Sequence, residues 1–332
     1  MNNKKKQSKK KFKKMMLFYL TTLAIFLVGY IGYIVYSAYN SATQTYVALE
    51  RGDKSELRED AVKLTKEPFS VLIMGVEDYS SGGENGRSDT IILATINPIK
   101  GDIQLLSVPR DTLVEIPEIG EDKINHSFSK GGKDLTLETV EQFLDIPIDY
   151  YVTIGFQGFK TLIDEVGGVT VEVPFSFSEK NDTTKELIYF TEGNMDLNGE
   201  EALAYVRMRK QDPRGDFGRN DRQKQVIENL FEELIKPSSV VKLDRIADKV
   251  SDEIQTNIKV SDGLSLISSL ARLDAQNIEK LQLIGEDDYI GGTYYFVPDA
   301  NELLGLKNDL KSHLELSSNA VLTDIKESAI EE

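Results

Sequence analysis

The chain has 332 residues, with 39 Lys and Arg against 55 Asp and Glu, two His, and neither Cys nor Trp. The lack of Cys excludes disulfides, zinc–thiolate sites and thiol nucleophiles, and it leaves His126 and His313 as the imidazole groups. Residues 1–39 hold eight Lys and no acid, so residues 40–332 carry 31 bases against 55 acids, a net charge of −24 that disfavours nucleic acid as a partner.

The amino terminus predicts a membrane anchor. A Lys-rich tail, 1–14, precedes an uncharged run, 15–36. As a helix this run would measure about 33 Å, enough to cross a bilayer of about 30 Å. The alternative is a cleaved signal peptide, but the run exceeds the usual apolar core and ends in three Tyr where small residues are expected. We therefore expect a single-pass membrane protein with a cytoplasmic N-terminus and an extracytoplasmic body.

A polar, partly helical stalk is predicted over 37–67, and the body is expected to begin near Pro68. Apolar runs and helical spacing then predict elements in chain order. The first half gives strands at 69–76, 90–97 and 102–109, a helix at 135–144, a strand at 149–154, a helix at 156–166 and a strand at 168–174. The second half gives helices at 199–208, 219–235, 240–249 and 261–273, strands at 278–284 and 294–297, and a helix at 299–316. This order predicts one layered α/β/α sandwich with a central mixed sheet over 68–316, followed by a frayed tail, 317–332.

The helix expected at 219–235 extends its apolar stripe into polar residues. The residues four and eight positions before the apolar Ile227 are Gln223 and Arg219, which lie on the same face of the helix. A buried guanidinium needs a partner. That partner is either a protein carboxylate, in a structural ion pair, or an anionic ligand at the helix N-terminus.

Residues 207–222 concentrate positive charge in an acidic body. They carry five Arg and one Lys against three Asp, and the planar guanidinium suits phosphate oxygens. Gly215 and Gly218 would let a ligand approach the backbone closely. The segment could equally be a solvated charged loop.

Carboxylates stand at the ends of the first three predicted strands. Glu77 and Asp78 follow the first, Asp89 precedes the second, and Arg110 with Asp111 follows the third. Oxygen ligands of this kind suit Mg²⁺ or Mn²⁺, although each could be an ordinary loop acid. We interpret His126 as a packing or hydrogen-bonding residue.

An ordered set of motifs resembles the LytR–CpsA–Psr family of Gram-positive cell-envelope phosphotransferases. The motifs are LIMGVE at 72–77, GRSDT at 86–90, LSVPRDT at 106–112, KINHSF at 123–128, GGVTV at 167–171, LNGEEALAYVRMR at 197–209 and GDFGRNDRQ at 215–223. They lie within 69–236, about half of the chain.

The resemblance implies transfer of an anionic glycopolymer (teichoic acid, capsule or a related polysaccharide) from a polyprenyl-pyrophosphate carrier to peptidoglycan, with magnesium. It places metal ligands at Glu77 and Asp89, with Asp78 as a substitute because the first position usually carries Asp. It places pyrophosphate contacts at Arg110, Arg207, Arg209, Arg219 and Gln223, with Arg87 and Asp111 beside them. It also implies an apolar tunnel for the lipid tail.

The implied chemistry is attack by a glycan hydroxyl on the sugar-side phosphorus, with Arg110, Asp111 and Arg219 as the catalytic group. Asp111 or Asp89 could accept the hydroxyl proton, or Asp111 could orient Arg110. Two alternatives stay open: a polyprenyl-pyrophosphate hydrolase, and a non-catalytic binder or sensor of the lipid-linked intermediate.

Overall fold

The computed structural model describes residues 45–64, 66–76, 86–236, 239, 243–250, 252–259, 262 and 277–316. The Lys-rich tail, the predicted anchor, most of the predicted helix 261–273 and the tail after 316 lie outside these ranges. Within the described part, no helix is both long enough and apolar enough to cross a bilayer. The anchor therefore stays a prediction.

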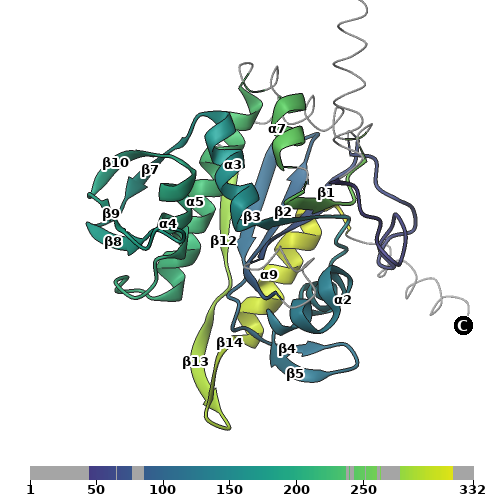
Figure 1. The fold of residues 1–332 in the computed structure, drawn as a ribbon. Coiled ribbons are helices and arrows are strands. Elements are labelled where there is room, and N and C mark those ends of the chain that lie inside the picture. The colour runs from purple at the N-terminus through teal and green to yellow at the C-terminus, as the bar shows by residue number, and fades with distance from the viewer. Residues whose placement is uncertain are drawn as a thin grey trace, which may run out of the picture.

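A six-stranded mixed sheet forms the centre of the body (Figure 1). Its order is β11 (Ile254–Thr256), β6 (Tyr150–Gly155), β1 (Phe69–Val76), β2 (Ser88–Asn97), β3 (Asp102–Ser107) and β12 (Ile278–Gln282). β1 runs parallel to β6 and antiparallel to β2, while β3 runs antiparallel to β2 and parallel to β12. The predicted mixed α/β fold is confirmed.

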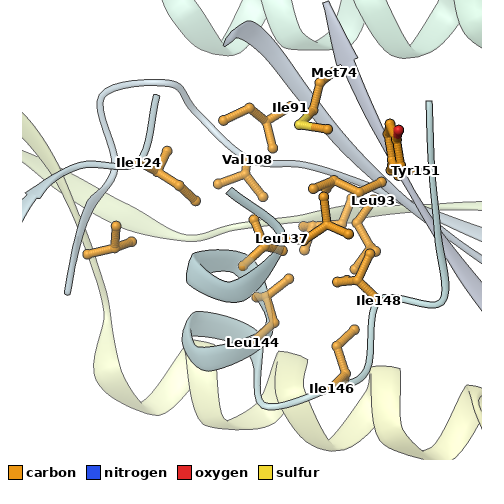
Figure 2. Packing of buried hydrophobic residues seen from close by; sticks show 14 of the residues in the cluster. Met74, Ile91, Leu93, Val108, Ile124, Leu137, Leu144, Ile146, Ile148 and Tyr151 are labelled. Carbon is orange, nitrogen blue, oxygen red and sulfur yellow. The ribbon is translucent and has the colours of Figure 1, made fainter. Parts of the chain in front are cut away.

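Both faces of β1 and β2 are buried, which explains their continuous apolar sequences. Leu72 and Met74 face a core formed with α2 (His126–Leu144) and α9 (Ala300–His313). Figure 2 shows this core, where Met74 and Leu93 lie above Leu137 and Leu144 of α2. Burying each such side chain contributes about 1.5–3 kcal/mol.

The opposite face of the sheet is covered by the second group of helices. These are α3 (Phe156–Val166), α4 (Gly199–Arg207), α5 (Asp216–Ile235) and α7 (Leu243–Val250). Val71 and Ile92, which alternate with the residues of the first core, pack with Ile227 of α5. Helices therefore lie on both faces of the sheet, as a layered sandwich requires.

Small antiparallel pairs of strands surround the sandwich, and only some of these strands were predicted. They are β4 (Leu113–Ile116) with β5 (Gly120–Lys123), β7 (Val169–Val173) with β10 (Gly193–Leu197), β8 (Phe177–Lys180) with β9 (Leu187–Phe190), and β13 (Gly285–Ile290) with β14 (Thr293–Pro298). Strands near β7 and β14 were predicted. Most of the others are four or five residues long and polar on their exposed side, so they lack an apolar run.

Two predicted helices start earlier than expected. α2 begins at His126, and Gly131 and Gly132 have non-helical φ/ψ angles that kink it. These glycines interrupt the helical spacing, so only the part of α2 after them was predicted. α5 begins at Asp216, so Arg219 lies in its first turn.

The described part of the predicted stalk packs against the body, contrary to the expectation of a partly helical stalk. Leu49 and Leu64 are buried in the two cores beside the sheet. Arg51 forms an ion pair with Glu141 of α2, and Arg58 pairs with Asp149 at 2.7 Å. The apolar positions in 46–64 were too sparse to predict this packing from the sequence.

Candidate functional site

A cavity of about 740 Å³ lies on the α5 side of the sheet. Part of its wall is apolar, formed by residues from β1, β6 and the helices α3, α4 and α5: Ile73, Ile154, Phe156, Phe159, Leu203, Val206, Val226 and Ile227. The rest of the wall is polar and strongly cationic. A site of this kind accommodates a ligand with one apolar and one anionic part.

The polar wall gathers predicted site residues from distant parts of the sequence. Arg110, Arg207, Arg209, Arg219 and Gln223 all line the cavity, together with Asp89. Arg87 is exposed and is not among the lining residues. The convergence fits the anionic-ligand interpretation of Arg219, and the individual roles remain predictions.

The first turns of α5 present Arg219 and Gln223 to the cavity. They are separated by one helical turn and are 6 % exposed each. The amide of Gln223 donates to Thr90 Oγ1 at 3.0 Å, which fixes the helix against β2. Because Arg219 lies in the first turn, the positive end of the helix dipole adds to the charge of its guanidinium.

Arg207 and Arg209 approach the cavity from the end of α4. Asn198 and Glu201 form a capping box that starts this helix, and Arg207 occupies its last turn. The Arg207 guanidinium lies 4.8 Å from the centre of the Phe156 ring, a cation–π contact that orients it beside the apolar wall.

A buried ion pair holds the segment that follows. Arg222 of α5 pairs with Asp212, and their side chains are 2 % and 1 % exposed. Arg222 also donates to the backbone carbonyls of Tyr205 and Met208. It therefore ties α4 and the 208–215 segment to α5, which positions Arg209. This role of Arg222 was not predicted, although its place three residues after Arg219 in the helix puts both side chains on nearly the same face.

A row of alternating acidic and basic side chains leads away from the cavity, from Asp89 through Arg110 and Asp111 to Lys123. Its Nη1 donates to Asp89 at 2.6 Å, and its Nε lies 3.5 Å from Asp111. Asp111 accepts from Lys123 Nζ at 2.7 Å, and this ammonium lies 5.6 Å from the ring centres of Tyr294 and Tyr295.

Asp111 stands behind Arg110 and does not line the cavity. Burial alone would raise its pKa, but the hydrogen bond and charge of Lys123 and the charges of Arg110 and Arg209 together lower it. A carboxylate held as an anion in this way is a weak base. Of the two roles considered for Asp111, the geometry fits orientation of Arg110.

The predicted metal site is described only in part. Glu77 and Asp78 lie outside the described residues, whereas Asp89 presents a carboxylate to the cavity. In the part of the chain that the structure describes, no group of three or more His, Cys, Asp or Glu could hold an ion. His126 bonds to Asp122 at 2.9 Å, which confirms its interpretation as a hydrogen-bonding residue.

Comparisons with known proteins give one consistent result. A family model described as the LytR_cpsA_psr family matches residues 32–312. The polyisoprenyl-teichoic acid–peptidoglycan teichoic acid transferase TagV of Bacillus subtilis (strain 168) is 50% identical over 282 residues, covering 83% of this chain and 72% of the relative.

Solved structures agree with the sequence matches. The crystal structure of B. subtilis TagV is 49% identical, with a TM-score of 0.69, and the match covers 75% of this chain and 98% of that one. A structure of the LytR-CPS2A-psr family protein YwtF (TagT) with bound octaprenyl pyrophosphate lipid is 33% identical, with a TM-score of 0.66, covering 81% and 99%.

Proposed function

This chain belongs to the LytR_cpsA_psr family, and we propose that it transfers an anionic cell-wall glycopolymer, in first place teichoic acid, from a polyprenyl-pyrophosphate carrier to peptidoglycan. The names of its relatives support both the donor and the acceptor. A family member with bound octaprenyl pyrophosphate supports the carrier. The product is a phosphodiester between polymer and glycan.

The observation that carries the proposal is the division of one cavity into an apolar wall and a cluster of four arginines. The apolar wall suits a polyprenyl tail, and the guanidinium groups suit the oxygens of a diphosphate. Because Arg219 and Gln223 are buried, their polar groups gain most from a ligand that fills the cavity.

In the proposed reaction, a muramic-acid hydroxyl of peptidoglycan attacks the sugar-side phosphorus. A new P–O bond forms, the bond from that phosphorus to the bridging oxygen breaks, and polyprenyl phosphate leaves with the electron pair. Arg110, Arg207, Arg209 and Arg219 hold the diphosphate and stabilise the charge that moves to the leaving oxygen. Of the two acids considered as proton acceptors, Asp89 is the one that lines the cavity, but it already accepts from Arg110 at 2.6 Å and is the metal ligand proposed below. The hydroxyl proton is therefore assigned to solvent water.

We further propose Mg²⁺, or Mn²⁺, as cofactor. The carboxylate of Asp89 in the cavity is the hard oxygen ligand that these ions prefer, with Glu77 or Asp78 as the second protein ligand. A bound ion would neutralise diphosphate charge. Removal of divalent ions with a chelator should abolish transfer and added Mg²⁺ should restore it; full activity in the chelator would contradict a metal.

The principal test replaces Arg219. Full-length protein in detergent is given a lipid-linked teichoic acid donor and peptidoglycan, and phosphodiester-linked product is measured. We expect Arg219→Ala to abolish transfer while the circular dichroism spectrum and melting temperature stay near those of the wild type. Arg214→Ala is the matched control, because Arg214 is 58 % exposed and pairs with Asp221 outside the cavity lining. Normal transfer by Arg219→Ala would refute the assignment.

The same assay separates the two alternatives. A hydrolase would release polyprenyl phosphate at the same rate with and without peptidoglycan, because water would replace the glycan hydroxyl. A binder or sensor would retain the donor without forming either product.

The predicted anchor gives the proposed location. With 15–36 in the membrane, the Lys-rich tail would be cytoplasmic and the cavity would lie outside the cell, where peptidoglycan is found. Protease added to intact protoplasts should digest the body; protection of the body would contradict this orientation.

A further inference from the structure

The cavity carries more positive charge than a diphosphate requires. Among its lining residues, seven Lys or Arg stand against three Asp or Glu, a net charge of +4 in a chain with a net charge of −16. The four arginines alone exceed the two negative charges of a diphosphate diester. Three further cations, Lys180, Lys185 and Lys210, are therefore not explained by the diphosphate.

These lysines come from two segments that lie together. Lys180 ends β8, Lys185 lies in the β8–β9 turn, and Lys210 directly follows Arg209. The side chain of Gln211 accepts from the backbone N–H of Ser178 and donates to its carbonyl, which joins the hairpin to the arginine segment. Figure 1 shows β8 and β9 beside α4, the helix that ends in Arg207.

The hairpin is anchored on both sides, so its lysines keep their place at the cavity. The rings of Phe177 and Phe190 stack with their centroids 4.6 Å apart, and both rings pack against Tyr205 of α4. Asp182, at the tip, lies 3.4 Å from the buried ammonium of Lys160 on α3. Fixed backbone with flexible side chains is a suitable arrangement for binding a chain of variable conformation.

The cations of the cavity differ in exposure. Arg219 is 6 % exposed and Arg110 and Arg209 are half-buried, whereas Arg207 and all three lysines are exposed to solvent. None of the three forms an ion pair with an acid among the described residues, so their charge is available to a ligand at the rim. An ammonium is a point charge on a flexible stem, which suits successive phosphates of varying geometry better than one fixed diphosphate.

We propose that Lys180, Lys185 and Lys210 form a second anion subsite that binds the phosphodiester groups in the first repeats of the donor polymer. This inference rests on the proposed function, because the polymer reaches the rim only if its diphosphate occupies the arginine cluster. The enzyme would then select donors that already carry phosphate repeats over carriers that hold only the linkage sugars.

The test compares two synthetic donors on full-length protein in detergent. Both carry the same polyprenyl pyrophosphate and linkage sugars, and one also carries several polyol-phosphate repeats. For wild type we expect a lower KM for the donor with repeats, and a decrease of this preference as sodium chloride rises. Exposed ion pairs contribute about 0.2–1 kcal/mol each, so three predict a preference of roughly threefold to a hundredfold.

The variant Lys180→Gln/Lys185→Gln/Lys210→Gln should lose this preference and turn over the short donor as wild type does. Because Lys185 also donates to the carbonyl of Asp182, the double variant Lys180→Gln/Lys210→Gln checks that hairpin distortion is not the cause. A control triple variant removes the same charge at distant exposed lysines: Lys100, Lys236 and Lys259.

The outcomes separate this inference from the proposed function. Wild type that treats both donors alike, variants that keep the preference, or variants that lose activity equally on both donors would each overturn the lysine subsite while transfer itself stands. If wild type transfers from neither donor, the proposed function fails, and the subsite fails with it.

Discussion

Substituting Gly218 with Ala tests whether the buried Asp212–Arg222 pair supports the site. A Cβ built at Gly218 would overlap the carboxylate of Asp212. This carboxylate is 1 % exposed and receives a hydrogen bond from Arg222. The carboxylate has to move away from the added methyl group, and the ion pair opens in a place that water does not reach.

Two opposing terms set the expected magnitude. Ala is favoured over Gly in a helix by about 1 kcal/mol. Opening a buried ion pair costs about 3–5 kcal/mol, because it leaves an uncompensated buried charge. The second term is larger, so we expect Gly218→Ala to lower the free energy of unfolding by about 2–4 kcal/mol.

Urea denaturation of the full-length protein in detergent, followed by circular dichroism, measures this change. Gly305→Ala in α9 is the matched control, since a Cβ there meets nothing within 4 Å and only the gain in helix propensity remains. We expect the control to be as stable as wild type or more so. If Gly218→Ala were as stable as Gly305→Ala, the reasoning about the buried pair would be refuted.

Three further predictions follow from the ion pairs. Lys123→Met removes the hydrogen bond from Lys123 to Asp111, the carboxylate that orients Arg110. A charged hydrogen bond contributes about 1.5–3 kcal/mol, so kcat/KM for transfer should fall about tenfold to a hundredfold. An unchanged kcat/KM would show that Arg110 does not depend on this hydrogen bond. Burial alone would raise the pKa of Asp122, but hydrogen bonds from a lysine, a histidine and a backbone N–H lower the pKa from 3.8 to about 2. The ionised carboxylate therefore stabilises the folded state fully above pH 3.8, and this stabilisation is lost as the pH falls toward 2. When the free energy of unfolding is measured as a function of pH, Asp122→Asn should therefore lose less stability than wild type between pH 3.8 and 2. Parallel curves for the variant and wild type would contradict the stabilising role of Asp122. Arg58→Met leaves Asp149 buried without its cation, and the free energy of unfolding should fall by about 3 kcal/mol in urea; a loss near zero would show that residues 46–64 are not tied to the body through this pair.

The inner strands of the central sheet were predictable because they are buried on both faces, whereas the edge strand β11 is only half-buried and was not predicted. Continuous apolar runs identified β1, β2 and β3, and helical spacing with glycines at the C-terminal end identified α3. The short strands β4, β5 and β8 were not predicted, because a strand of four residues that packs at the edge of the body needs no continuous apolar run. The packing of 46–64 was missed for the same reason. β9 was also missed, although its sequence LIYF is an apolar run.

The sequence by itself singled out part of the candidate site. The charge anomaly at 207–222 and the polar extension of the apolar stripe of α5 pointed to Arg219 and Gln223, because charge and helical spacing are local properties, but they left open whether the partner is a carboxylate or an anionic ligand. The motifs then identified the family, which the comparisons confirmed.

The tertiary structure decided which of these residues act together. It placed Asp89 in the cavity and Asp111 behind Arg110, two acids that the sequence could not tell apart. It also brought Lys180 to the rim beside Lys210, thirty positions later in the chain. Position relative to a cavity depends on how distant segments pack, and no local pattern of residues records that.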